Sequence, residues 1–257
     1  MLQNIKLVTF DALHTLITPR APIYVQYSQV FTPYLGVLPP ESIKRSFKEA
    51  LKAVQKEHPS YDKGVENWWR DVIRRTALGA GGNEREIDAH LSEIAKKLIK
   101  RFSSREGYRA FDDAIPTLHH LHNQLGVRTA VVSNGDSRIR AVLKDLDFPD
   151  TLWPVVLSDE EGIEKPSNEI FLKVLELVNN SYEHGRILPS ECGHIGDELT
   201  CDYHGGVNAG FNTLLLRRPG PEGEHEHKDE NESLEGVKVI HGLEEVIPWV
   251  QERNELA

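Results

Sequence analysis

The sequence predicts an α/β protein with a doubly wound parallel sheet and an all-helical insertion. Short, β-rich and nearly continuous apolar runs are typical of buried parallel strands. Helical periods separate these runs through the C-terminal half of the chain, which predicts a sheet covered by helices on both faces. Between the first run and the second, residues 20 to about 108 show helical periods and no strand candidate.

Six apolar runs are predicted to be strands: IKLVTF (5–10), VRTAVVS (127–133), WPVVLS (153–158), CGHIG (192–196), NTLLL (212–216) and VKVI (237–240). The helical periods of the core lie at 113–125, 137–146, 167–179, 200–209 and 242–251. Those of the insertion lie at 23–35, 40–57, 65–78 and 84–102. We therefore predict two domains, an α/β core of residues 1–18 and 109–257 and a helical cap of residues 19–108.

Charge and composition exclude several kinds of partner. The net charge of −10 argues against nucleic acid and anionic membranes, which would need clustered Lys and Arg. No run of 18 apolar residues is present, so no membrane span is expected. Cys192 and Cys201 are the only cysteines, which favours a reducing compartment. The first strand begins near Ile5, which leaves no room for a targeting peptide, so we expect the cytoplasm or the nucleus.

Polar residues follow the carboxyl ends of predicted strands, where open α/β sheets bind ligands. Asp11 follows the first strand, and Ser133 and Asn134 end the second. Hydroxyl and amide groups there, with nearby backbone N–H groups, suit an anionic oxygen. Asp197 and Asp202 follow CGHIG, and paired carboxylates suit Mg²⁺, which prefers oxygen ligands.

Lys165 stands just before Pro166 and a helix start, where it could neutralise a phosphoryl or carboxylate group. Taken together, FDALHTL, VVSNGD, EKP and HIGDELTCDYHGGVNAG resemble the haloacid dehalogenase superfamily, whose hydrolases form an aspartyl-enzyme intermediate. The resemblance covers nearly the whole chain and accounts for the helical insertion as a cap.

The resemblance implies a Rossmann-like core and a role for each motif residue. Asp11 would be the nucleophile, while Ser133 and Lys165 would hold the transferred group. Substrate contacts would come from Thr15, Asn134 and Gly135. Mg²⁺ would be held by Asp11, the backbone carbonyl of Leu13, Asp197 and Asp202.

Leu13 departs from the pattern of the family's phosphatases, which carry Asp two residues after the nucleophile. Side chains alternate along an extended segment, so residues 11 and 13 would face the same side. The second Asp protonates the leaving alkoxide and then activates water, which is typically worth about 10²–10⁴-fold. Leu13 can do neither.

Three interpretations follow from Leu13. In the first, the leaving group needs no proton, as in the 2-haloacid dehalogenases. The stretch DALHT of this chain resembles the corresponding stretch of those enzymes. Alternatively, His14 substitutes, although in an extended segment it would point away from Asp11. In the third, the site is degenerate and the fold serves binding or assembly. The intact IGDELTCD stretch disfavours dehalogenation, because dehalogenases need no metal.

The favoured function is therefore a Mg²⁺-dependent, phosphatase-like hydrolase of a small phosphorylated metabolite, with compromised acid–base chemistry. The first alternative is a catalytically degenerate protein of the same fold that binds a protein partner. The second is a hydrolase of the 2-haloacid dehalogenase type. Because fold does not fix function, the choice depends on the site.

Overall fold

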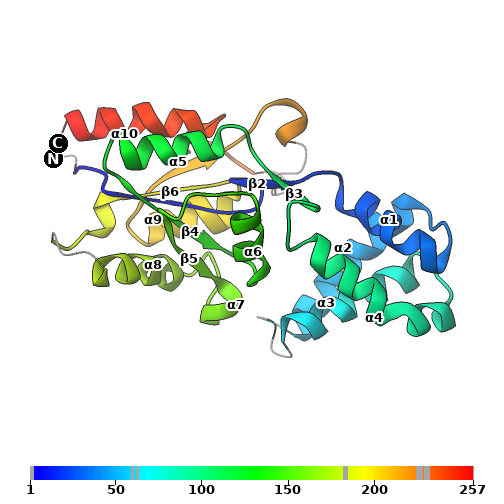
Figure 1. The fold of residues 1–257 in the computed structure, drawn as a ribbon. Helices are drawn as coiled ribbons and strands as arrows, with labels where there is room; N and C mark the ends of the chain where they lie inside the picture. The colour runs from blue at the N-terminus through cyan, green and yellow to red at the C-terminus, as the bar shows by residue number, and fades with distance from the viewer. Residues whose placement is uncertain are drawn as a thin grey trace. The chain divides into compact units, whose positions relative to one another are not determined.

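The computed structural model describes residues 3–58, 61, 64–181, 185–223, 228 and 232–256 (Figure 1). The chain divides into two compact units. The first, the core unit, comprises the residues up to Thr18, Ala110–Arg140 and the residues from Asp147 onward. The second, the helical unit, comprises Pro19–Arg109 and Ala141–Leu146.

The core unit contains a six-stranded parallel sheet in the order β5-β4-β1-β6-β7-β8, which confirms the predicted fold class. The strands are β1 (Leu7–Phe10), β4 (Arg128–Ser133), β5 (Leu152–Leu157), β6 (Cys192–Gly196), β7 (Asn212–Leu216) and β8 (Val239–Ile240). β1 is central: Phe10 pairs with Val131 on one side and with Ile195 on the other. This register brings the ends of β1, β4 and β6 to one edge of the sheet.

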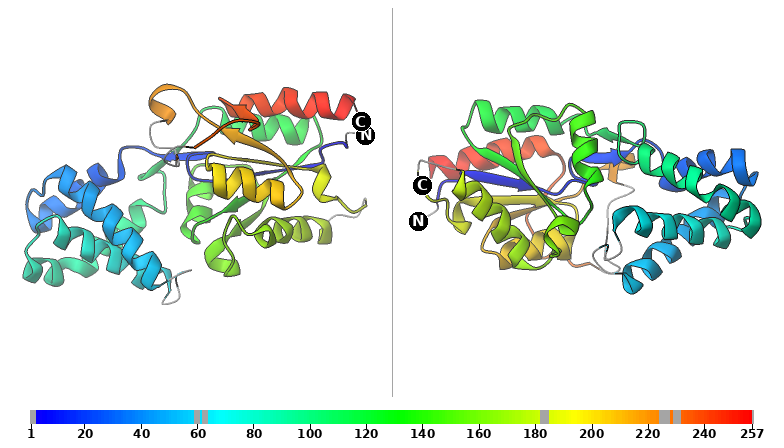
Figure 2. Two further views of the ribbon diagram at one scale, coloured as in Figure 1. Left: turned by 180° about the vertical axis from the view of Figure 1, so that it is seen from behind. Right: turned by 60° about the horizontal axis from the view of Figure 1, so that its bottom comes forward.

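Helices cover both faces of this sheet (Figures 1 and 2). Side by side over one face lie α5 (Ala114–Asn123) and α10 (Val246–Glu255). The other face is covered by α8 (Asn168–Asn180) and α9 (Gly205–Asn208), which contact each other. The remaining elements are α6 (Arg138–Asp145), α7 (Ser158–Glu161), a π-helical segment (Leu199–His204) and short 3₁₀ turns (Pro189–Glu191, Gly220–Gly223, Leu243–Glu245).

Two short strands were not predicted from the sequence. β2 (Ile17–Pro19) and β3 (Tyr108–Ala110) form a separate two-stranded sheet. They lie at two of the points where the chain passes between the units defined above, after Thr18 and after Arg109. Three-residue strands are too short to show an alternating pattern, so sequence periodicity cannot reveal them.

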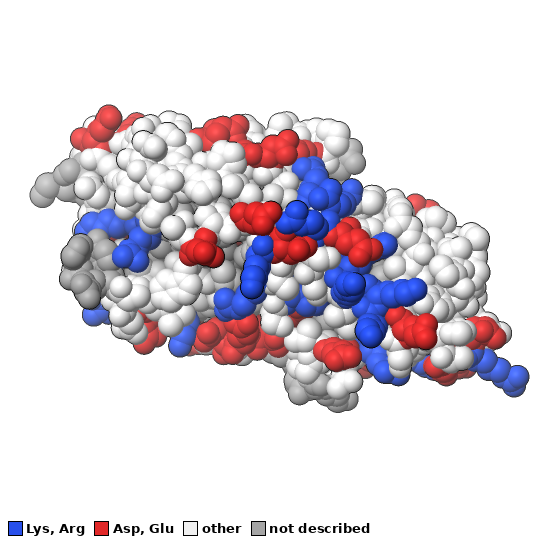
Figure 3. All heavy atoms as spheres, viewed as in Figure 1, with Lys and Arg blue, Asp and Glu red and all other residues white. Residues whose placement is uncertain are grey.

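The helical unit contains α1 (Ile23–Leu35), α2 (Pro40–Glu57), α3 (Val65–Gly79) and α4 (Glu84–Arg101). Each helix contacts two others, because α1 packs against α2 and α4, and α3 packs against the same two. Their apolar faces bury a cluster that includes Tyr27, Phe31, Ile43, Ile73, Ile87 and Leu98. A second cluster, between α2 and α3, contains Ala50, Val54, Trp68 and Val72. Among the described residues, no helix has the length and apolar character needed to cross a membrane. The face of the molecule in Figure 3 mixes acidic and basic side chains rather than gathering one sign.

Candidate active site

The side chain of Lys165 lies between two carboxylates at the sheet edge. Its Nζ donates to Asp11 Oδ1 at 2.5 Å and to Asp202 Oδ1 at 2.6 Å. All three side chains are buried, with at most 9% of any of them exposed. Asp11 comes from the end of β1 and Asp202 from the π-helical segment after β6, so residues far apart in sequence form one ionic cluster.

The backbone of Lys165 is fixed by Asn134, the residue directly after β4. Asn134 Nδ2 donates to the Lys165 carbonyl at 2.9 Å, and the Lys165 N–H donates to Asn134 Oδ1 at 2.7 Å. This paired contact gives the Asn134 amide a role in placing the lysine. The substrate contact predicted for Asn134 stays a prediction.

Asp202 accepts hydrogen bonds on both carboxylate oxygens. Besides Lys165, Oδ1 faces His194 Nε2 at 3.1 Å, while Oδ2 accepts from the Glu198 N–H at 2.9 Å. The carboxylate packs directly over Gly196, where a Cβ would lie 2.1 Å from Asp202 Cγ. The Gly of HIGD is therefore required for Asp202 to reach the cluster.

Burial and charge shift the pKa values within the cluster. Burial, together with the neighbouring charges of Asp202 and Asp197, raises the pKa of Asp11 to about 7 even though Lys165 opposes the rise. Burial would raise the pKa of Asp202 as well, but Lys165 and His194 hold it well below its ordinary value. Burial would lower the pKa of Lys165, but the two carboxylates raise it. Lys165 and Asp202 therefore stay charged, and Asp11 is the carboxyl whose ionisation the surroundings oppose.

His194, within β6, continues the cluster toward the interior and was not singled out from the sequence. Its Nδ1 lies 2.8 Å from Thr9 Oγ1 on the neighbouring strand, and its ring is fully buried. The Phe171 ring packs against it in a T-shaped arrangement, with ring centroids 4.9 Å apart. Burial lowers the pKa of His194 despite the hydrogen bond to Asp202.

Asp11, Asp197 and Asp202 each offer a carboxylate oxygen, and these three atoms lie within 4.8 Å of one another. When all three carboxylates are ionised, the single ammonium leaves this buried cluster with an excess of two negative charges, which a divalent cation would balance. Oxygen donors of this kind suit Mg²⁺. Asp202 already accepts hydrogen bonds on both oxygens, so a metal at Asp202 would have to share an oxygen with these donors.

Two arginines after β7 also donate hydrogen bonds to backbone carbonyls at this edge. Arg217 donates to the backbone carbonyl of Asp197 and forms a bidentate pair with Glu232. Arg218 donates to the carbonyl of Thr15 at 3.2 Å and forms a bidentate pair with Asp113, with both contacts at 2.8 Å. The dipeptide gave no signal in the sequence, because nothing local links it to residues 15 and 197.

The other predicted residues are placed as follows. Ser133 ends β4 and is buried, and the Gly135 N–H donates to its carbonyl at 3.1 Å. Thr15 is fully buried, and its hydroxyl has no hydrogen-bond partner among the described residues. Leu13 is partly exposed. The roles predicted for these residues stay predictions.

The segment after Leu13 is not extended as expected. His14 is buried and has φ 63°, and the N–H groups of Leu16 and Ile17 both donate to the Ala12 carbonyl at 2.9 Å. The chain therefore turns at His14, because these backbone bonds close a tight loop there. Side-chain alternation cannot be used to place His14 relative to Asp11.

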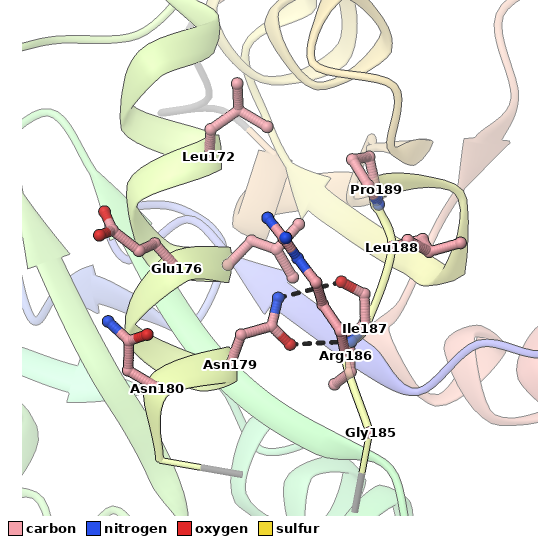
Figure 4. Close-up of a pocket in the computed structure, with 10 residues that line it drawn as sticks. Leu172, Glu176, Asn179, Asn180, Gly185, Arg186, Ile187, Leu188 and Pro189 are labelled. Atoms are coloured by element: carbon pink, nitrogen blue, oxygen red, sulfur yellow. Dashed lines mark hydrogen bonds between the residues drawn. The ribbon is translucent and has the colours of Figure 1, made fainter.

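A cavity lies away from this cluster (Figure 4). It is bordered by the end of α8 and the segment leading to β6, so it lies near the amino end of that strand. Asn179 joins the two sides, donating to the Ile187 carbonyl at 3.0 Å and accepting from its N–H at 2.8 Å. None of the residues predicted for the site borders this cavity.

Known proteins share both the sequence pattern and the fold. The sequence model of the haloacid dehalogenase-like hydrolases matches residues 5–210. Haloacid dehalogenase-like hydrolase domain-containing protein 3 of Bos taurus is 28% identical over 222 residues, covering 85% of this chain and 84% of that protein. The human protein of the same name is 29% identical over 220 residues, covering 84% of this chain and 83% of that protein.

Two solved structures show the same fold at low identity. The 2-haloacid dehalogenase of Pseudomonas syringae pv. Tomato is 23% identical, with a TM-score of 0.63 over 97% of this chain and 99% of that one. The HAD-hydrolase YfnB of Bacillus subtilis, bound to magnesium, is 16% identical, with a TM-score of 0.67 over 97% of this chain and 100% of that one. With most of its length matched by the family's sequence model, this chain belongs to the haloacid dehalogenase-like hydrolases.

Proposed function

We propose that this chain is a Mg²⁺-dependent hydrolase that cleaves a small phosphorylated molecule through a phospho-Asp11 intermediate. The observation that carries the proposal is the buried cluster of Asp11, Lys165 and Asp202 with Asp197 beside it. Its excess negative charge supports a divalent cation as a resident cofactor, as does the magnesium bound to the structurally similar YfnB. The cytoplasm or the nucleus remains the expected location.

Asp11 and Lys165 divide the chemistry between them. Lys165 holds Asp11 Oδ1, so the second oxygen of Asp11 is the one we assign to attack on phosphorus. That attack forms an O–P bond while the bond to the leaving oxygen breaks. The Lys165 ammonium compensates negative charge on the transferred group. A Mg²⁺ held by Asp11 and Asp197, with the Leu13 carbonyl as a further donor, would supply positive charge opposite the phosphoryl oxygens.

Leu13 then determines which substrates react well. An alkoxide needs a proton as it leaves, and Leu13 cannot donate one. Aryl and acyl phosphates have leaving groups that need little protonation, so we expect them to react much faster than alkyl phosphates. Water must then cleave phospho-Asp11 to give inorganic phosphate and the free carboxylate, and this step also lacks acid–base help from Leu13.

The test compares aryl, acyl and alkyl phosphates in Mg²⁺ and in chelator. We expect Mg²⁺-dependent cleavage of the first two, a burst of product and a trapped phospho-Asp11, all absent in Asp11→Asn. Leu13→Asp should raise turnover by roughly 10²-fold or more, the lower end of the acid–base contribution. Activity that persists in chelator or in Asp11→Asn would contradict the proposal.

A folded Leu13→Asp variant that binds Mg²⁺ but turns over no substrate would favour the alternative, a protein of this fold that binds a partner. The replacement of the usual acid by Leu13 is the observation behind that alternative. Release of halide from a 2-haloacid would favour the dehalogenase type, which the retained acidic cluster disfavours.

A further inference from the structure

A continuous path of polar contacts runs from β1 through β6 to Lys165. Thr9 Oγ1 lies 2.8 Å from His194 Nδ1, and His194 Nε2 lies 3.1 Å from Asp202 Oδ1. The same Asp202 oxygen accepts from Lys165 Nζ, which also bonds Asp11. Thr9 and His194 are both completely buried, so bulk solvent does not reach these groups.

The contacts define where the proton on the His194 ring must lie. Asp202 Oδ1 is an acceptor, so the facing Nε2 must carry a hydrogen, because two acceptors in contact would leave a buried polar pair unsatisfied. A neutral ring with Nε2–H has a lone pair on Nδ1. Thr9 can satisfy that lone pair by donating its hydroxyl hydrogen at 2.8 Å.

The Thr9 hydroxyl has a competing acceptor in the carbonyl of Gly193, at 3.1 Å. If its single hydrogen went there, Nδ1 would need a hydrogen as well, and the ring would be an imidazolium. That state would place a second buried cation beside the Lys165 ammonium. The shorter contact to Nδ1 and a neutral ring avoid this repulsion.

Packing prevents the ring from adopting another orientation. His194 pairs directly with Thr9 in the register of β1 and β6, so the two side chains share one face of the sheet. The Phe171 ring packs against the imidazole in a T-shaped arrangement.

We propose that Thr9 and His194 are positioning residues, with the Thr9 hydroxyl fixing His194 in its Nε2–H form so that Asp202 is held on Lys165 and Lys165 on Asp11. The catalytic consequence rests on the function proposed above. The hydrogen-bond arrangement does not, because it follows from the contacts and from donor counting alone. Neither side chain touches substrate in this account.

Nitrogen NMR of protein labelled with ¹⁵N-histidine tests the arrangement in the intact chain. His194 is identified by the signal that His194→Asn removes. At neutral pH we expect hydrogen on Nε2 alone and a hydrogen-bonded lone pair on Nδ1. Thr9→Ser should preserve this Nδ1 signal, and Thr9→Val should shift it toward that of an unbonded nitrogen. A ring protonated on Nδ1 alone, or on both nitrogens, would overturn the proposal.

Matched variants then separate positioning from packing. Gln can place an amide N–H near the position of Nε2, whereas the shorter Asn cannot. We expect His194→Asn and Thr9→Val to lower kcat on an aryl phosphate by about 10- to 100-fold, the range for outer-shell partners, with KM nearly unchanged. His194→Gln and Thr9→Ser should recover most of the rate.

Equal losses in His194→Gln and His194→Asn would mean that only ring packing matters, and this would also overturn the proposal. If the wild-type protein cleaves no phosphate ester, the proposed function fails on its own. The nitrogen signals still decide whether Thr9 and His194 hold Asp202 as described.

Discussion

Two regions of the molecule use the same charge pattern, one cation between two carboxylates, in opposite surroundings. In the core unit, Lys165 bridges Asp11 and Asp202, and all three side chains are buried. In the helical unit, Arg74 bridges Glu84 at 2.9 Å and Asp88 at 2.8 Å. There the Arg74 side chain is 33% exposed and the carboxylates 67% and 51%.

The difference shows that burial changes what the same ionic pairing does. Burial raises the pKa of Asp11 to about 7 despite the adjacent ammonium. The hydrogen bond from Arg74 lowers the pKa of Asp88, because water leaves little desolvation to oppose it. A buried cluster is therefore sensitive to each partner and can bind a cation, whereas an exposed one is screened and contributes little.

The largest effect is expected from Lys165→Met. This change leaves Asp11 and Asp202 buried without their cation, and we expect a loss of about 3–5 kcal/mol in the free energy of unfolding. Urea denaturation at pH 7.5 in chelator measures it. Adding Asp11→Asn to this variant should restore part of the loss, since one buried charge is then gone. A loss below about 1 kcal/mol, the size typical of exposed pairs, would show that the buried cluster behaves like the exposed one.

An intermediate effect is expected at Asp113, whose partner Arg218 is buried with its guanidinium 3.8 Å from the centre of the Phe111 ring. Burial would raise the pKa of Asp113, but the bonds from Arg218 and from the Leu243 N–H hold it below its ordinary value. A lowered pKa in the folded state stabilises the protein above the unfolded pKa, and this contribution is lost as pH falls through the folded value.

Asp113→Asn should therefore lower the free energy of unfolding by about 1–3 kcal/mol at pH 7, the range for hydrogen bonds to charged groups. The difference from wild type should shrink as the pH falls below about 4. Urea unfolding between pH 7 and pH 3 gives both quantities. Asp112→Asn, at the exposed neighbouring position, is the matched control and should change little. A difference that stays constant with pH would show that the carboxylate charge is not the cause.

The same distinction explains what the sequence can and cannot predict. Apolar runs and helical periods predicted the parallel sheet, and strand-end placement pointed to Asp11, Lys165 and Asp202, because strand ends in such a sheet meet at one edge. The Thr9–His194 contact depends on the register of β1 against β6, and no local pattern encodes register. His194 looks like one more residue of a buried strand until its neighbour is known.

The sequence did not predict the direction of the chain after Leu13 either. The turn at His14 depends on two backbone bonds to the Ala12 carbonyl, and neither Gly nor Pro marks it in the sequence. The pairing of Arg218 with Asp113 joins residues 105 positions apart. Contacts of this kind follow from the fold as a whole.

The smallest effect is expected from Arg74→Gln, which removes the bridging cation of the exposed cluster and keeps a polar side chain. Water solvates Glu84 and Asp88 once the arginine is gone, so we expect Tm to fall by less than about 4 °C. The fall should shrink further toward 1 M NaCl, where the Debye length is about 3 Å and exposed charges are screened.

Lys165→Met in the same salt series is the matched comparison, and its loss should persist because salt does not reach the buried cluster. If Arg74→Gln destabilised the protein as much as Lys165→Met at every salt concentration, exposure would not be what separates the two clusters. The helices α3 and α4 would then depend on Arg74 as the core depends on Lys165.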